Sequence, residues 1–509
     1  MLQRIWASLG ISALILIITT VGQVVMVPIL LSRWGDQLYG EWVTLTNLVS
    51  GLSIINFGVQ SYVLNILIGH HVRNEVEQGT QVLHAALRLY VVLCSIILLI
   101  TLGLCLWPDL LNWLNIKALS SMESRLIVFI EGALAAYAIL GGLLMTLLVA
   151  TKQYPRRLRY SLMERLIFFV VPMIIAILGG LPLATVVASG ALTAVLAFVQ
   201  FRDVRIRSPF SLGLDGVRWR ESAALIQPSL LFFAVTLASQ VEDMGIILVI
   251  STSAGAQAVA LFSTTLMLTN FVRTIINQGL NILWPEITAA ANTEHGQLLR
   301  WHRLMLKLIT GFALLATSGL ILLGTSVLEI WTRGKIQVNA PLNILLTLYL
   351  LVHAPALVSR TFGLATNHQG AIFRADITTA VMEVLLALAL FPRLGLFGAA
   401  LALVAGQSFN TIWVMLMAAG WTSDSWMELI HSWGIRGFPT AIIVLILSTV
   451  GLSIIPSFAG RAGAFGLIAL LGIGLGWQTW FSRTEREGIE NIISSLAKRF
   501  KRSQVKGAT

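Results

Sequence analysis

Charged residues are scarce in this sequence: only 11% of its 509 residues are Asp, Glu, Lys or Arg. A soluble globular domain has about 25%. Hydrophobic residues make up 57% of the chain, and its mean hydropathy is +0.84. The composition excludes a soluble protein and predicts an all-α integral membrane protein with no extramembrane domain larger than a loop.

Cysteines and catalytic motifs are almost missing as well. The only two cysteines, Cys94 and Cys105, fall in one predicted helix, where eleven residues separate them by roughly 16 Å, too far for a disulfide. His70-His71 and His84 lack the H-E-x-x-H spacing, and the chain has no Walker A or Rossmann glycine pattern. We therefore expect no enzyme, no catalytic residue, no metal site and no cofactor other than a coupling ion, H+ or Na+.

Apolar runs of about 20 residues, the length that crosses a bilayer, recur along the whole chain. We expect about fourteen transmembrane helices, at 7–32, 42–67, 88–107, 125–150, 161–179, 182–201, 223–250, 257–284, 304–324, 341–365, 373–392, 397–418, 437–456 and 463–481. An even number places both termini on one side. Most of the 34 Lys and Arg residues also fall on that side, which makes it the cytoplasm. The net charge of +11 is thus a topology signal and does not indicate nucleic acid as a partner.

A weak internal repeat divides the chain into halves. The matches are Gly35 with Gly255 and Gln37 with Gln257 at an offset of 220, and Ala150-Thr151 with Ala365-Thr366 and Gly180-Leu181 with Gly395-Leu396 at 215. Six helices per half make the repeats parallel, and such halves hold a substrate site at their interface and work by alternating access. The sequence therefore predicts a transporter made of two pseudo-symmetric six-helix bundles plus two C-terminal helices.

The expected domains follow from this division. They are an N-terminal six-helix bundle (1–201), a basic cytoplasmic linker (202–222), a C-terminal six-helix bundle (223–418), two additional transmembrane helices (419–481) and a basic amphipathic cytoplasmic tail (482–509). The tail carries apolar residues on one helical face with Lys and Arg beside them, a pattern typical of an interfacial helix on anionic lipid.

The spans 223–250 and 257–284 contain the most informative charges. An ionisable group at the bilayer centre costs about 2.5–3.5 kcal/mol and normally faces a wet cavity or a partner. Glu242 and Asp243 lie in the first span, and Arg273 lies in the second. If one span runs outward and the other returns, Arg273 lies about 12 Å deeper than the acids, so a direct salt bridge is not expected. The acids suit a proton or a cation, with helix bracing as the alternative.

Amide side chains surround the arginine. Asn270, Asn277 and Asn281 are spaced three and four residues from Arg273 or from one another, on one face of the helix. A guanidinium flanked by amides can bind a phosphate and sugar hydroxyls. We expect these residues to line a substrate cavity, and a buried structural pair for Arg273 stays open as the alternative.

Other polar residues within the spans are further candidates. One face of the span 42–67 presents three of them, which either line the cavity or link helices by hydrogen bonds: Ser53, Asn56 and Gln60. Three weaker candidates, for which packing is the alternative role, are Glu131, Arg360 and Glu383. The arginine is also placed so that it can snorkel to the membrane interface.

Several runs carry a resemblance to a known family. They are Arg33-Trp34-Gly35-Asp36-Gln37-Leu38-Tyr39-Gly40-Glu41-Trp42, Ile54-Ile55-Asn56-Phe57-Gly58-Val59 and Leu394-Gly395-Leu396-Phe397-Gly398-Ala399-Ala400-Leu401-Ala402, together with the acid pair of the span 223–250. With them the chain resembles the polysaccharide (O-antigen and exopolysaccharide) flippase branch of the MATE-like multidrug/oligosaccharidyl-lipid/polysaccharide exporter superfamily. The likeness covers essentially the whole chain.

The resemblance implies a fold and a function. The fold is a V-shaped pair of six-helix bundles whose first, second, seventh and eighth helices line a central cavity. The function is to move an undecaprenyl-diphosphate-linked oligosaccharide from the cytoplasmic to the periplasmic leaflet of the bacterial inner membrane. The acids would couple transport to protons or sodium, and Arg273 would meet the diphosphate or an acidic sugar. The expected partners are this lipid-linked oligosaccharide, membrane lipids and polysaccharide-assembly proteins.

Three alternatives stay open. A cation-coupled multidrug antiporter of the same superfamily often carries an acidic residue in its first helix, and this chain has none there. A flippase of the peptidoglycan lipid precursor would be expected to have several basic residues in its first helices. A membrane polymerase or ligase of surface polysaccharide would need a long, charged outer loop, whereas the outer loops predicted here are short.

Overall fold

The computed structural model describes residues 2–50, 52, 58–114, 116–292, 295–331, 339–422, 424–483 and 485–487. Helices form all the regular structure in this part of the chain, and no strand occurs within it. Twelve helical stretches of the described residues are long and apolar enough to cross a membrane, close to the fourteen expected. The all-helical membrane fold predicted from the sequence is therefore confirmed.

The chain divides into two compact units. The first consists of Met1–Ala234 and Asn281–Thr293, and the second of Val235–Leu280 and Glu294–Thr509. The domain boundaries predicted from the sequence stay a prediction. Helices of the first unit are α1 (Leu2–Ser50), α2 (Val59–Val72), α3 (Val76–Leu106), α4 (Leu110–Trp113), α5 (Ser121–Ala150), α6 (Tyr154–Ile177), α7 (Pro182–Arg207) and α8 (Trp219–Ala224).

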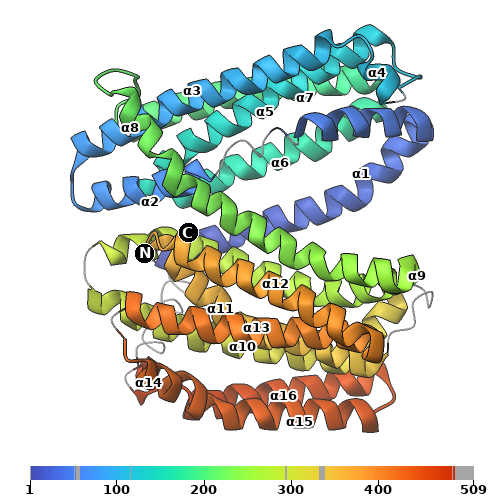
Figure 1. The fold of residues 1–509 in the computed structure, drawn as a ribbon, viewed down its shortest axis with the longest axis vertical. Coiled ribbons are helices and arrows are strands. Elements are labelled where there is room, and N and C mark those ends of the chain that lie inside the picture. Colours follow the sequence, from blue (N-terminus) through green and yellow to red (C-terminus); the bar gives the residue numbers. More distant parts are fainter. Residues whose placement is uncertain are drawn as a thin grey trace, which may run out of the picture. The chain divides into compact units, whose positions relative to one another are not determined.

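The second unit is built around four long helices and a C-terminal pair (Figure 1). Its elements are α10 (His295–Trp331), α11 (Ala340–Ala365), α12 (Gln369–Leu394), α13 (Leu396–Trp421), α14 (Trp426–Leu429), the π-helix η2 (Ile430–Ile435), α15 (Arg436–Ile454) and α16 (Phe458–Thr479). α9 (Ile226–Ala291) has both ends in the first unit and its middle in the second.

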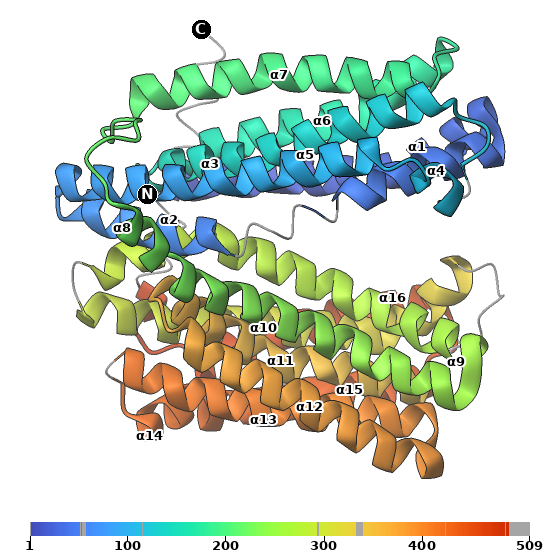
Figure 2. The ribbon, with the colours of Figure 1, turned by 45° about the horizontal axis from the view of Figure 1, so that its top comes forward.

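Two helices, α1 and α9, are each folded back on themselves. α1 is interrupted at Gly35, whose φ of 76° and ψ of 170° lie outside the helical region and favour glycine. α9 has 66 residues and would be about 100 Å long if it were straight. Instead its ribbon runs out and returns (Figure 2). The outgoing and returning arms of α9 correspond to the predicted spans 223–250 and 257–284.

The repeat is visible in the backbone at the predicted offset of 215. α5 ends at Ala150 and α11 at Ala365, while α6 begins at Tyr154 and α12 at Gln369. Between them, Lys152 and Asn367 share a positive φ of 62°. The N–H of Gln153 bonds to the carbonyl of Leu148 at 2.7 Å, and that of His368 bonds to Gly363 at 2.7 Å. Both loops thus close with the same left-handed helix cap.

Helix starts in the first unit follow standard local chemistry. Ser120 caps α5 and forms a reciprocal capping box with Glu123. α6 and α7 each begin with a proline in the first turn, Pro155 and Pro182, where the missing N–H costs no helical hydrogen bond. These signals fix the boundaries of helices that are otherwise uniformly apolar.

The returning arm of α1 is fastened to its bundle by the run Arg33–Trp42. The indole of Trp34 donates to the carbonyl of Gly180 at 2.8 Å. The buried carboxylate of Glu41 accepts the backbone N–H groups of Lys117, Ala118 and Leu119 at 2.8 to 2.9 Å. One carboxylate therefore satisfies three amides of the loop between α4 and α5, and this part of the quoted motif holds the fold together.

Glu41→Gln should destabilise the protein, because a neutral amide accepts these bonds more weakly. Burial raises the pKa of Glu41, but the bonds from Ala118, Lys117 and Leu119 outweigh it and hold the pKa below its usual 4.5. The wild-type advantage is therefore present above about pH 4.5 and is lost as the pH falls through the lowered pKa. We expect a loss of roughly 2 kcal/mol at neutral pH, or a few degrees of melting temperature.

Melting curves in detergent at several pH values measure this effect. Glu77→Gln, at an exposed acid in the first turn of α3, is the matched control and should leave the melting temperature unchanged. An equal melting temperature of Glu41→Gln and wild type at neutral pH would contradict the role given to Glu41.

Candidate functional site

Two buried acids of the second unit share a single amide donor. Gln407 on α13 donates through Nε2 to Oε1 of Glu242 on α9 at 2.7 Å, and to Oε1 of Glu383 on α12 at 3.1 Å. Glu242 is 7% exposed, and the other two side chains are fully buried. We name these three residues the acidic layer.

The acidic layer depends on close packing of α12 against α13. A Cβ atom on Gly406 would lie 2.1 Å from Cγ of Glu383, so only glycine leaves room for that carboxylate at this position. Two carboxylates linked to one amide repel each other when both are ionised. Because a buried charge in a membrane needs compensation, this arrangement favours uptake of a proton or a monovalent cation between them.

A second polar layer is built from the same helices. Arg360 on α11 donates from Nε to Oδ2 of the buried Asp376 at 3.0 Å, and from Nη2 to the hydroxyl of Ser239 at 2.9 Å. The amide of Asn410 donates to the other oxygen of Asp376 at 3.4 Å. We name Arg360, Asp376, Ser239 and Asn410 the arginine layer.

The two layers are related by helical spacing. Ser239 precedes Glu242 by three residues on α9, and Asp376 precedes Glu383 by seven on α12. Asn410 follows Gln407 by three on α13. Such spacings put each pair on one face of its helix, one or two turns apart. The arginine layer therefore anchors the helices that carry the acidic layer.

Sequence reasoning named only part of this cluster. It identified Glu242, Glu383 and Arg360 but did not connect them, and it missed Asp376, Gln407 and Asn410. The signal was present, because Asp376 and Glu383 share one face of an apolar helix and Gln407 and Asn410 share one face of the next. The side chain of the predicted Asp243 lies outside the described residues.

Arg273, the arginine predicted to bind the substrate, lies on the returning arm of α9. Nη1 of Arg273 donates to the hydroxyl of Tyr349 at 2.9 Å, and that hydroxyl lies 3.2 Å from Nδ1 of His353. Arg273 and Asn277 are half-buried. The side-chain oxygen of Asn270 is buried and has no hydrogen-bond partner within the described part of the chain. Asn281, by contrast, belongs to the first unit and is exposed.

An arginine oriented by a tyrosine, beside an unsatisfied amide oxygen, can bind a ligand that has both a negative charge and a donor group. The guanidinium supplies charged donors, and the carboxamide of Asn270 supplies an acceptor. A buried acceptor without a partner costs free energy in the empty site, and a ligand hydroxyl would remove this cost.

Candidates in the first unit fall at separate places. The amide of Gln60 donates to the carbonyl of Ile139 at 3.0 Å and packs on Gly142, which links α2 to α5. Glu131 lines a cavity of about 610 Å³ between α5, α6 and α7 that also contains Arg157 and Glu164. Ser53 and Asn56 lie outside the described residues.

Among the described residues, no group of three or more His, Cys, Asp or Glu side chains is placed to hold a metal ion. The acidic layer provides carboxylate oxygens and one amide N–H donor, and its carboxylates can take up a proton or accept a hard monovalent cation.

Arg360→Gln should destabilise the second unit by about 3–5 kcal/mol, because it leaves the carboxylate of Asp376 buried without its cation. Adding Asp376→Asn should recover much of that loss. Chemical unfolding of the two single variants and of the double variant in detergent provides the double-mutant cycle. Arg374→Gln, at an exposed arginine of α12, is the control. Equal stability of Arg360→Gln and wild type would show that the arginine layer does not stabilise the fold.

Comparison with known proteins gives a fold and no family. No protein-family model matches the chain, and no curated protein matches it. Solved structures do match. An outward-facing multidrug resistance MATE family transporter of the MOP superfamily is 15% identical, with a TM-score of 0.66, over 83% of this chain and 95% of its own.

Two further structures agree with this match. A MATE transporter in the bent conformation is 15% identical, with a TM-score of 0.66, over 82% of this chain and 94% of its own. The Vibrio cholerae MATE transporter VcmN in the bent form is 14% identical, with a TM-score of 0.65, over 83% of this chain and 96% of its own. At such low identity the likeness concerns the fold alone, and this chain has the fold of MATE transporters.

Proposed function

We propose that this chain is an ion-coupled exporter that translocates an undecaprenyl-diphosphate-linked oligosaccharide across the bacterial inner membrane by alternating access. The observation that carries the substrate class is the unsatisfied buried oxygen of Asn270, three residues before Arg273 on the returning arm of α9, together with the bond that holds Arg273 to Tyr349. A diphosphate accepts charge-assisted hydrogen bonds from a guanidinium, and sugar hydroxyls donate to amide oxygens. Both termini then lie in the cytoplasm, in keeping with the distribution of Lys and Arg.

The acidic layer supports the coupling part of the proposal. Glu242 and Glu383 meet through Gln407, so a proton or sodium ion bound there changes the charge that these buried acids carry. Because α9 carries both Glu242 and Arg273, an ion that binds at Glu242 acts on the same helix that carries Arg273. This gives a physical route from ion occupancy to substrate binding.

A cation-coupled multidrug antiporter is the second candidate function. The multidrug transporters among the matching structures favour it, and their fold fits this chain equally well for either substrate class. Against it, the predicted first span, 7–32, contains no acidic residue to attract a cationic drug. The two candidates differ in the charge of the ligand, which makes Arg273 the residue that separates them.

Arg273→Ala should abolish export of the lipid-linked oligosaccharide while the protein still inserts into the membrane. The expected loss is at least about tenfold, since one hydrogen bond to a charged group contributes about 1.5–3 kcal/mol. Flipping of a labelled lipid-linked oligosaccharide in proteoliposomes measures it. Arg273→Lys should keep part of the activity, because an ammonium retains the charge without the bidentate geometry.

Arg393→Ala, at an exposed arginine of α12, is the matched control and should transport normally. Undiminished flipping by Arg273→Ala would refute the assignment. Wild-type protein that moves cationic drugs and leaves the lipid-linked oligosaccharide in place would favour the antiporter instead.

Glu242→Gln and Glu383→Gln should each remove the dependence of transport on an ion gradient. Because the two acids act through one amide, the double variant should be no worse than either single variant. Transport in proteoliposomes under imposed pH and sodium gradients measures this, with the exposed Glu329→Gln on α10 as control. Wild-type transport that ignores both gradients would remove the coupling role.

A further inference from the structure

A pocket of about 620 Å³ lies in the second unit, apart from the acidic and arginine layers. It is an open pocket lined by the first half of α10, by α14, η2 and the start of α15, and by the segment that follows α16. Its charged lining residues are Arg303, Lys307, Glu428, Arg436 and Glu485, and one histidine, His431, lines it with them. None of these residues has a role in the proposed transport reaction.

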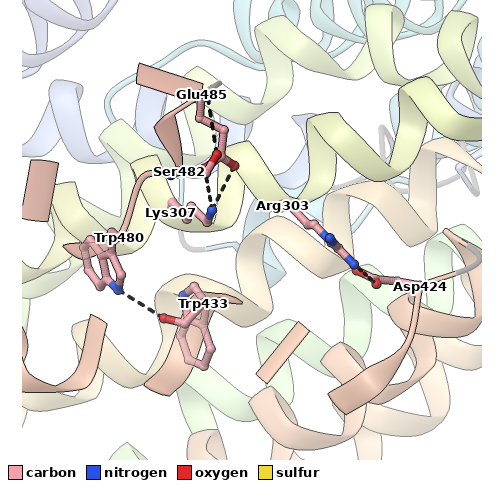
Figure 3. Close-up of polar contacts among 7 residues, drawn as sticks. All are labelled: Arg303, Lys307, Asp424, Trp433, Trp480, Ser482 and Glu485. Atoms are coloured by element: carbon pink, nitrogen blue, oxygen red, sulfur yellow. Dashed lines mark hydrogen bonds and ion pairs between the residues drawn. The ribbon is translucent and has the colours of Figure 1, made fainter. Parts of the chain in front are cut away.

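The segments around the pocket are held together by specific contacts (Figure 3). The indole of Trp480, just after α16, donates to the carbonyl of Trp433 in η2 at 3.1 Å. A Cβ on Gly437 would lie 1.2 Å from Nε1 of Trp480, so this indole packs directly on the glycine. The indole of Trp433 in turn donates to Thr310 on α10 at 3.0 Å. The pocket is therefore a built feature of the fold.

All three acids around the pocket are already paired. Arg303 forms an ion pair with the buried Asp424 and bonds to Glu428 at 2.6 Å. The ammonium of Lys307 lies 2.8 Å from both carboxylate oxygens of Glu485. Figure 3 shows the contacts of Arg303 with Asp424 and of Lys307 with Glu485.

Two basic side chains of the pocket are not paired. Within the described residues, neither the side chain of Arg436 nor that of His431 makes a hydrogen bond or an ion pair, and both residues are exposed. His431 belongs to the π-helix η2, a type of helix that is rare and is frequently found at functional sites. The guanidinium of Arg436 therefore keeps its N–H donors for an anion, and the imidazole of His431 can add a further hydrogen bond.

The pocket also lies where a membrane surface is expected. α10 has 37 residues and is about 55 Å long, whereas the hydrocarbon core of a bilayer is about 30 Å thick. The third and fourth turns of α10, the start of α15 and the segment just after α16 meet at the pocket, so it lies toward one end of these helices. Large apolar side chains beside it are exposed: Trp426 by 52%, Met427 by 64% and Phe438 by 66%. Such side chains next to Arg and His are typical of the lipid headgroup region.

We propose that this pocket binds the phosphate of an anionic phospholipid headgroup, with Arg436 and His431 as its donors. An arginine offers two parallel N–H groups to phosphate oxygens, and basic pockets between transmembrane helices on the cytoplasmic side bind anionic headgroups in this way. The exposed apolar side chains of α14 and α15 then lie against the acyl chains. This site is independent of the transported substrate.

The test is lipid binding by the full-length protein, measured by native mass spectrometry after titration with phosphatidylglycerol. The double variant Arg436→Gln/His431→Gln should bind phosphatidylglycerol roughly tenfold more weakly, the loss expected when a charge-assisted bond is removed. Arg300→Gln is the matched control, since Arg300 is exposed on α10 and does not line the pocket. An unchanged elution volume and melting temperature would show that the double variant is folded.

Two further titrations distinguish a lipid headgroup from soluble phosphate as the ligand. Phosphatidylcholine should bind much more weakly than phosphatidylglycerol, and inorganic phosphate should not compete. Equal retention of phosphatidylglycerol by the double variant and wild type would overturn the proposal. Displacement of the lipid by inorganic phosphate at millimolar concentration would overturn the headgroup assignment and identify a site for soluble phosphate.

Discussion

The burial of two carboxylates beside one carboxamide is the interaction on which the second unit depends. Glu242 and Glu383 come from different helices and are joined through Gln407 on a third. Each contact would be weak in water, yet in hydrocarbon there is no solvent to replace it. The three helices must therefore pack closely enough to satisfy these acids, and Gly406 makes that approach sterically possible. The buried acids of the acidic layer, which are costly in the membrane, therefore require one specific packing of α9, α12 and α13.

Several charged side chains of this protein join elements that lie far apart along the chain. The arginine layer joins α11 to α12 and α9, and Glu41 joins the returning arm of α1 to the loop before α5. Near the ends of the helices, Lys307 and Glu485 join α10 to the chain after α16. Removing one partner of a buried ion pair leaves an uncompensated charge, so a packing that separates Arg360 from Asp376 is costly.

The fold was largely predictable from the sequence because bilayer thickness dictates span length and the repeat dictates two similar bundles. Lys152 and Asn367 adopt the same left-handed conformation at equivalent positions, as the offset between Ala150-Thr151 and Ala365-Thr366 predicts. The site was less predictable. Glu242 and Arg273 were recognisable as intramembrane charges, but Gln407 was not, since a single glutamine in an apolar helix has no distinctive pattern.

The sequence by itself determined the membrane class, the approximate number of spans and the internal repeat, because all three follow from local hydropathy and spacing. It also identified most of the charged residues that the bilayer makes costly. Only the tertiary structure decided which of them are neighbours. Asp376 is paired with Arg360, Glu383 shares an amide with Glu242, and Arg273 bonds to Tyr349. Partners that lie far apart along the chain depend on how helices rotate and cross, and hydropathy carries no information about either.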